Sequence, residues 1–156
     1  MIEITNEVYL GFKRRDVFYA GSLVDLLPNG VGGIHFETEE ALSNLALGVP
    51  LGMSMDNIPI LGHVDSKVRE FKKGRCIKIE GGEGSSFVHM ALSIDLSDNG
   101  KGTDALYKFL LEPGSFPVRL AMRGICGSLR GRIEECIEGY HANVANYLEA
   151  GKLAVA

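Results

Sequence analysis

The chain has 156 residues, of which 46% are hydrophobic and 23% charged, and its formal net charge at pH 7 is −4. This length and balance are typical of a single globular domain, which we place over residues 1–156, and they exclude a disordered chain and a general nucleic-acid-coating protein. The three cysteines form no CxxC pair and no apolar run approaches the roughly 18 residues of a membrane span, so we expect a soluble, cytoplasmic protein with reduced thiols and no membrane partner.

The first third of the chain predicts two strands and two helices. Hydrophobic residues alternate over residues 2–12, which indicates a half-buried strand. A helix is expected over residues 16–27, where Asp16 can cap its start, and a short strand over residues 33–37. Thr38 is expected to cap a second helix that ends at Gly48.

The middle third predicts antiparallel β-structure. Strands are expected over residues 58–71, 75–80 and 86–96, and the last of these has a clean apolar face. The glycine-rich loop at residues 81–85 predicts a hairpin between the second and third of these strands.

The last third predicts both helix and strand. Thr103 is expected to cap a short helix that ends before Pro113, and residues 117–123 are expected to form a strand. Hydrophobic residues then recur at three- and four-residue spacing over 129–148, which predicts a helix of about 22 residues. Residues 153–155 are expected to form a terminal strand. The whole pattern predicts an α/β or α+β fold, in which about four helices pack on a single mixed sheet with a central antiparallel hairpin, in a two-layer or three-layer sandwich.

The Gly- and Arg-rich segment 119–132 is the main candidate site. If a strand ends near residue 123, the glycines that follow start the long helix, and the unpaired N–H groups of a helix start favour an anion. Four arginines lie in this segment without an intervening acid, and the arginine fork matches phosphate or carboxylate. We therefore predict an anionic ligand bound by Arg119, Arg123, Gly124, Gly127, Ser128 and Arg130. The alternative is an ordinary N-cap at Ser128 with solvated surface arginines.

Candidate catalytic residues are Cys126, His89 and His63. Cys126 falls at the predicted helix start, where a thiolate is favoured, but a nucleophile needs a base, which would have to come from His35, His63 or His89. A packed, inert cysteine is the alternative. His63 and Asp65 point to one side of a predicted strand, but two ligands do not make a metal site, so neither a metal nor another cofactor is predicted.

These observations leave three functional hypotheses. The first is a small enzyme that binds an anionic metabolite at segment 119–132, with its reaction type open. The second is a non-catalytic, homo-oligomeric metabolite-binding or structural protein, which a long amphipathic helix would permit. The third is a nucleic-acid-binding module that uses the basic residues of segment 67–78. A lysine-rich edge strand also explains those residues, and it agrees better with the negative net charge.

Overall fold

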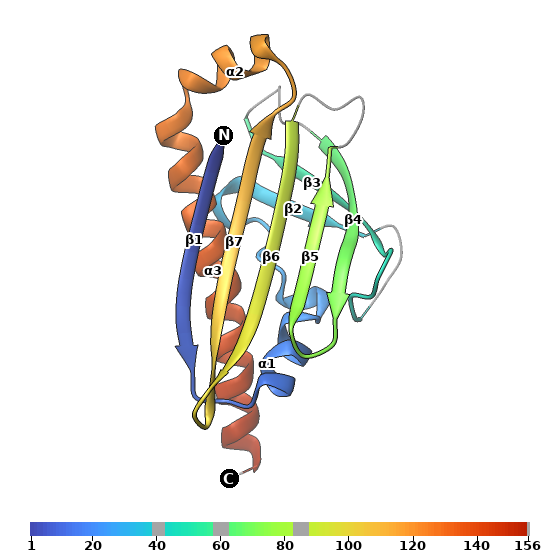
Figure 1. Ribbon diagram of the computed structural model, residues 1–156, viewed down its shortest axis with the longest axis vertical. Helices are drawn as coiled ribbons and strands as arrows, with labels where there is room; N and C mark the ends of the chain where they lie inside the picture. Colours follow the sequence, from blue (N-terminus) through green and yellow to red (C-terminus); the bar gives the residue numbers. More distant parts are fainter. Residues whose placement is uncertain (39–42, 58–62, 83–87, 156) are drawn as a thin grey trace.

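The structure is a computed structural model that describes residues 1–38, 43–57, 63–82 and 88–155. Its strands are β1 (Ile2–Leu10), β2 (Ile34–Glu37), β3 (Pro50–Met55), β4 (His63–Lys72), β5 (Cys76–Gly81), β6 (Val88–Asn99) and β7 (Gly102–Pro113). Its α-helices are α1 (Arg14–Gly21), α2 (Phe116–Arg123) and α3 (Cys126–Val155), and two short 3₁₀ helices are η1 (Val24–Leu26) and η2 (Val31–Gly33). The strands form one sheet in the order β1-β7-β6-β5-β4-β3-β2 (Figure 1).

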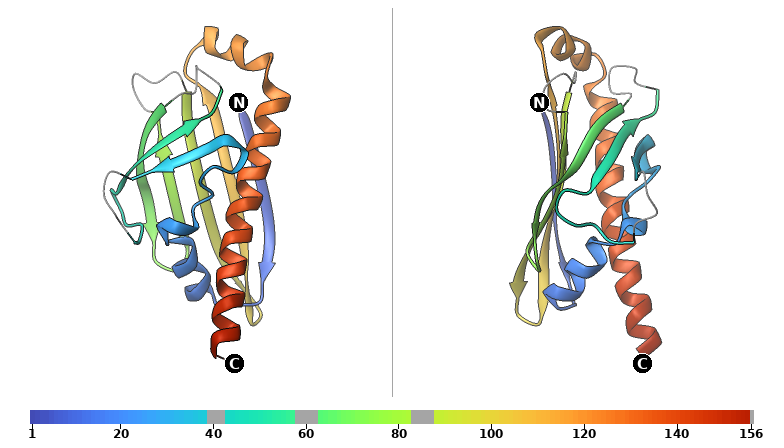
Figure 2. Two further views of the ribbon diagram at one scale, coloured as in Figure 1. Left: turned by 180° about the vertical axis from the view of Figure 1, so that it is seen from behind. Right: turned by 90° about the vertical axis from the view of Figure 1, so that its right-hand side faces the viewer.

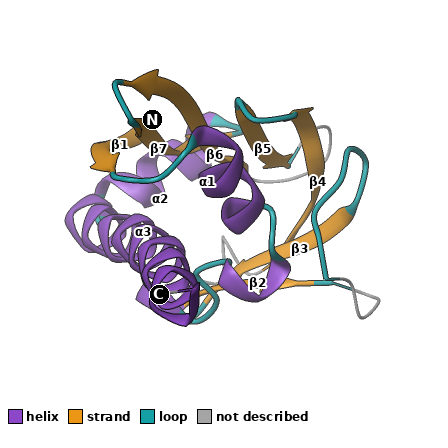
Figure 3. Cartoon of the chain, turned by 90° about the horizontal axis from the view of Figure 1, so that it is seen from below, coloured by secondary structure: helices purple, strands orange, loops and turns teal. Residues whose placement is uncertain are grey.

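The sheet curls around the helices that cover one of its faces. α3 lies lengthwise along the concave face beside α1, and the convex face carries no helix of the described residues (Figure 2). Seen along the long axis, the strands wrap around α1 and α3 as an open half-barrel (Figure 3). The fold is therefore α+β, as one of the two predicted classes states. The described strands are all antiparallel rather than mixed, and three α-helices take the place of the expected four in the described part of the chain.

Four strand predictions are confirmed, because β1, β2, β5 and β6 lie where the alternating patterns place them. The antiparallel pairing of β5 with β6 is confirmed as well. β4 matches the described part of the strand expected over residues 58–71, while residues 58–62 lie outside the described residues. The hairpin loop expected at 81–85 also falls largely outside them.

Two neighbouring predictions in the last third of the chain are wrong: the expected helix is a strand, and the expected strand is a helix. Residues 102–113 form β7 instead of a helix. The prediction was wrong because outward-facing leucines at 106 and 110 conceal the alternation of the buried positions. Residues 116–123 form α2 instead of a strand. The buried residues of α2 are Val118 and Met122, and a spacing of four fits one helix face as well as one strand face. Residues 153–155 continue α3 and form no terminal strand.

The helix expected over residues 38–48 is not found in its described part. Residues 39–42 lie outside the described residues, and residues 43–48 form a β-bridge and turns. The next segment forms β3, where no strand was predicted although Leu51, Met53 and Met55 alternate with less buried residues, and β3 pairs with β4. β4 therefore lies inside the sheet, between β3 and β5, so the edge-strand explanation of its basic residues is wrong.

The buried side of α3 packs against strands at both edges of the sheet, β1 and β2, so that one hydrophobic core results. The buried positions of α3 are Leu129, Ile133, Cys136, Ile137, Tyr140, Val144 and Leu148, all of which the sequence periodicity predicts. Three side chains of α3 donate hydrogen bonds to backbone carbonyls of other segments: Arg132 Nη1 to that of Asp56 (2.5 Å), Tyr140 Oη to that of Gly21 (2.5 Å), and Asn143 Nδ2 to that of Leu26 (3.0 Å). Among the described residues, no helix combines the length and the apolar character that crossing a membrane requires.

Candidate functional site

The predicted anion-binding segment lies at a junction between two helices. α2 ends at Arg123 and α3 starts at Cys126, and Gly124 between them has helical dihedral angles (φ −69°, ψ −20°). The expected strand-to-helix turn at this point is therefore wrong, since the preceding segment is already helical. Arg119 and Arg123 are four residues apart on α2 and share one exposed helix face. The other predicted ligand residues, also mostly exposed, are Gly124, Gly127, Ser128 and Arg130.

Arg132, the last arginine of this segment, has a structural partner. Its guanidinium donates to the backbone carbonyl of Asp56 at the end of β3. The backbone of α3 also approaches η2 so closely here that a Cβ added at Gly32 would collide with the Arg132 carbonyl. This end of α3 is thus closely packed against the loop that precedes β2.

The candidate catalytic residues Cys126 and His89 lie in different parts of the fold. Cys126 is half-buried against the core, and its thiol makes no hydrogen bond within the described part of the chain. His89 lies on the convex face of the sheet, where Nε2 is 2.7 Å from Glu80 Oε1. Burial raises the pKa of Glu80, but the hydrogen bond from His89 and the nearby Lys78 ammonium (3.3 Å) outweigh it, so that this pKa is lowered. None of these contacts joins Cys126 to a histidine.

His63 pairs with Asp65, as their spacing on one strand predicts. Nε2 of His63 is 2.9 Å from Oδ1 of Asp65, and both side chains are exposed. Asp56 belongs to a different pair, with its Oδ2 at 2.9 Å from His35 Nε2. Within the described residues, no group of three His, Cys, Asp or Glu side chains is placed to hold a metal ion.

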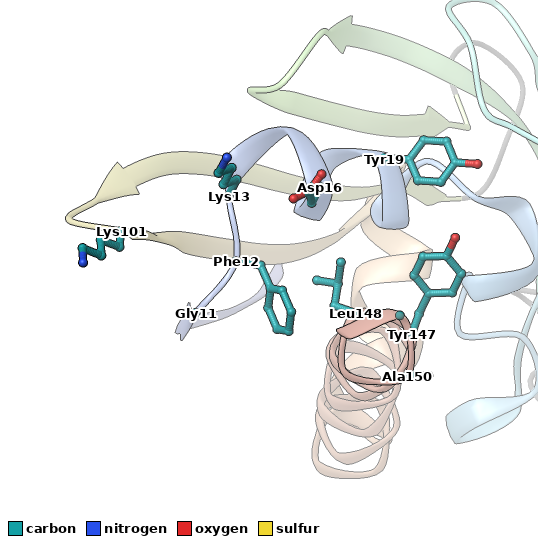
Figure 4. A pocket seen from close by; sticks show the side chains of 10 residues that line it. Gly11, Phe12, Lys13, Asp16, Tyr19, Lys101, Tyr147, Leu148 and Ala150 are labelled. Carbon is teal, nitrogen blue, oxygen red and sulfur yellow. The ribbon is translucent and has the colours of Figure 1, made fainter. Parts of the chain in front are cut away.

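A large groove lies at the opposite end of the molecule from the α2–α3 junction. It has a volume of about 860 Å³ and opens between the loop after β1, α1 and the last turns of α3 (Figure 4). We call it the apolar groove and define it by its lining: Gly11, Phe12, Lys13, Asp16, Tyr19, Lys101, Tyr147, Leu148, Ala150 and Gly151. Pockets of about 300–1,000 Å³ are typical of small-molecule sites.

Aromatic side chains form much of the wall of the apolar groove. Tyr147 extends from α3 toward Tyr19 on α1, and Leu148 lies between Tyr147 and Phe12 (Figure 4). Tyr19 and Tyr147 keep 53% and 41% of their surface exposed. Two partly exposed rings facing one hollow offer apolar surface that a ligand can bury.

Local structure holds these groups in place. The loop after β1 is fixed to β7, because the buried hydroxyl of Thr103 donates to the Phe12 carbonyl at 2.8 Å. α1 is held against α3 by the bond from Tyr140 to Gly21. Lys101 comes from the turn between β6 and β7, and Lys13 precedes α1, so two cations line one end of the groove. The Asp16 carboxylate of α1 lies between Lys13 and Tyr19 (Figure 4).

The sequence did not indicate the apolar groove. Tyr147 belongs to the periodic hydrophobic run 129–148, which predicted that it faces the core, but the neighbouring Leu148 occupies that face and Tyr147 points about 100° away from it. The useful signal was the pair itself, because two successive residues on a helix point about 100° apart, so one of two large side chains can lie at the edge of the buried stripe. Nothing in the sequence, however, places residues 11–19 beside Lys101 and Tyr147.

No protein-family profile and no curated protein matches the sequence. Solved structures share the fold. The match to a Thermus thermophilus protein has a TM-score of 0.63 and 12% identity and covers 94% of this chain and 99% of the other. A conserved protein from Geobacillus kaustophilus matches with a TM-score of 0.59 and 16% identity over 93% and 96% of the two chains. An AHSA1-like protein from Aeromonas hydrophila matches with a TM-score of 0.54 and 14% identity over 97% and 95%.

At these identities the likeness establishes the fold alone. The neighbours have helix-grip-like folds, in which a curled antiparallel sheet surrounds a long helix, and this chain shares that arrangement.

Proposed function

We propose that this protein binds a small amphipathic molecule, whose apolar part lies in the apolar groove and whose polar end points toward Lys13 and Lys101. The observation that carries the proposal is the pair of partly exposed tyrosines, Tyr19 and Tyr147, on the wall of an 860 Å³ groove. The proposal keeps the small-molecule ligand expected from the sequence and moves its site from segment 119–132 to the other end of α3.

The energetics of the groove support binding. Covering apolar surface contributes about 25 cal/mol per Å², and an aromatic ring that packs against a ligand adds to this through its shape and quadrupole. Tyr19 lies on α1 and Tyr147 on α3, and the hydrogen bond from Tyr140 to Gly21 fixes these helices to each other, so the backbone positions that carry both rings are set before a ligand arrives. A preformed wall lowers the entropy cost of binding.

The test is a titration of ¹⁵N-labelled protein with 1-octanol, a probe with an apolar chain and no charge. We expect amide shifts concentrated at residues 11–19 and 147–151. Tyr147→Ala should weaken binding about tenfold, because it removes one wall of the groove. The matched control is Phe116→Ala, which removes an aromatic ring that is 66% exposed on α2 and should leave binding unchanged.

A second variant compares the two candidate sites directly. Arg123→Ala combined with Arg130→Ala removes two arginines of the site predicted from the sequence, and we expect no change in octanol binding. If this variant abolished binding and Tyr147→Ala did not, the ligand site would lie at the α2–α3 junction and the proposal would be wrong.

A further inference from the structure

A second hollow adjoins the apolar groove and differs from it in charge. It has a volume of about 660 Å³ and is formed by the start of α1, the turn between β4 and β5, and the turn between β6 and β7. We call it the basic hollow, lined by Lys13, Arg14, Arg15, Lys73, Gly74, Asp98, Gly100, Lys101 and Gly102. It shares Lys13 and Lys101 with the apolar groove, so the two cavities are neighbours that meet at these side chains.

The cations of the basic hollow are only partly neutralised. Five lining side chains are cationic and one, Asp98, is a carboxylate, on a chain whose net charge is −4. Asp98 lies 3.7 Å from Arg14, and Arg15 lies 3.8 Å from Asp16. For the remaining three, Lys13, Lys73 and Lys101, no carboxylate of the described residues lies within 4.0 Å.

The backbone around the basic hollow leaves room for an anion. α1 begins here without a side-chain cap on its first N–H groups, because the N-cap residue is Lys13. Gly74 and Gly100 have positive φ angles in the two turns, and a Cβ added at Gly100 would meet no atom within 4 Å. Uncapped N–H groups with several cations around one hollow suit an anion that has several oxygens.

We infer that the ligand of the apolar groove is a phosphate monoester or diphosphate, and that its phosphate lies in the basic hollow. This inference rests on the proposed function, since the apolar part of the same molecule would occupy the groove. A single carboxylate neutralises one cation, whereas a phosphate monoester carries close to two charges and three acceptor oxygens. Three unneutralised lysines and the start of α1 match the second kind of group.

The experiment compares three probes that share one chain: 1-octanol, octanoate and octyl phosphate, followed by amide NMR shifts at 20 mM and 200 mM NaCl. We expect octyl phosphate to bind about tenfold more tightly than octanoate at low salt, with the difference reduced at high salt. Lys73→Glu should weaken octyl phosphate about fivefold and leave 1-octanol unchanged, since Lys73 lines only the basic hollow of these two cavities. Lys67→Glu, an exposed charge change on β4, is the matched control.

The outcomes separate the inference from the proposed function. Equal affinities for octanoate and octyl phosphate, with 1-octanol still bound at the groove, would overturn the phosphate assignment alone. If inorganic phosphate bound as tightly as octyl phosphate and 1-octanol did not bind, the groove would fail and the basic hollow would be a separate anion site. Binding to phosphatidic acid vesicles without binding of soluble octyl phosphate would identify a membrane headgroup as the source and overturn the small-molecule assignment.

Discussion

A cluster of cations lies near each end of α3, but the two clusters are built in different ways. At the α2–α3 end, Arg119, Arg123 and Arg130 follow one another along helices and lie on their outer surfaces. At the α1 end, the cations come from three segments that are far apart in sequence and surround one hollow. Cations that are close in sequence on a helix spread over its surface, whereas cations on separate turns can converge. Convergence in space, and not density in sequence, distinguishes a candidate site here.

The largest expected effect tests the close packing at the α2–α3 end. Gly32 has a φ angle of +67°, and a Cβ there would collide with the Arg132 carbonyl, so Gly32→Ala should lower the free energy of unfolding by about 2–4 kcal/mol. Gly11→Ala, at the apolar groove, should change it by less than about 0.5 kcal/mol, because a Cβ there meets nothing within 4 Å. Urea unfolding measures both. Similar values for the two variants would contradict the close approach of η2 to α3 at Arg132.

A smaller effect tests what holds the α1 end in place. Tyr140→Phe leaves the Gly21 carbonyl without its partner and should cost about 1–2 kcal/mol of unfolding free energy. Tyr107→Phe is the matched control, since Tyr107 Oη is buried and has no hydrogen-bond partner among the described residues, and its removal should be neutral or stabilising.

Hydrogen exchange locates the effect of Tyr140→Phe. Amide protection should fall more at residues 14–21 than at residues 116–123, because the lost bond joins α3 to α1. An equal loss of protection at both helices would show that the two ends are not stabilised separately.

The smallest effect concerns the middle of α3, between the two ends. Burial lowers the pKa of His141, whose ring lies against that of Tyr107 with centroids 5.5 Å apart. The unfolded chain therefore takes up this proton at a higher pH than the folded protein, and the free energy of unfolding should decrease as the pH falls from about 6.5 through the lowered pKa. His141→Gln should remove this part of the pH dependence, as measured by urea unfolding between pH 7.5 and 5. If the pH dependence of the unfolding free energy were the same in His141→Gln as in the unchanged protein, His141 would not be its source.

The sequence predicted the parts of the fold in which one periodicity is unambiguous. β1, β5 and β6 alternate cleanly, and the inner stripe of α3 repeats at helical spacing over five turns. The pattern was ambiguous where apolar residues occur on both faces, as at Leu106 and Leu110 of β7, which lie half-buried on the convex side. β3 was missed because Pro50 and Gly52 are typical of turns, although pairing with β2 and β4 makes the segment a strand.

The candidate site was harder to predict than the fold, for a physical reason. The lining of the apolar groove depends on Lys101 and Tyr147 meeting residues 11–19, and only tertiary packing brings these segments together. A local pattern could indicate helix ends and charge clusters, as it did at segment 119–132. The roles predicted for Cys126, His63 and His89, like the expected homo-oligomer, stay predictions, and native mass measurement is the direct check on the last of these.

The order of the strands has a consequence for how the chain folds as it leaves the ribosome. From β2 to β7, each strand pairs with the one made just before it, so this part of the sheet can grow as synthesis proceeds. β1 is made before all of them, but its partner is β7, with Ile2 opposite Leu111 and Leu10 opposite Thr103. It must wait about 100 residues for that pairing, and contacts of such large sequence separation slow folding. The earliest strand of the sheet to be synthesised is thus the last to enter it, and until then β7 presents an unpaired edge to other nascent chains.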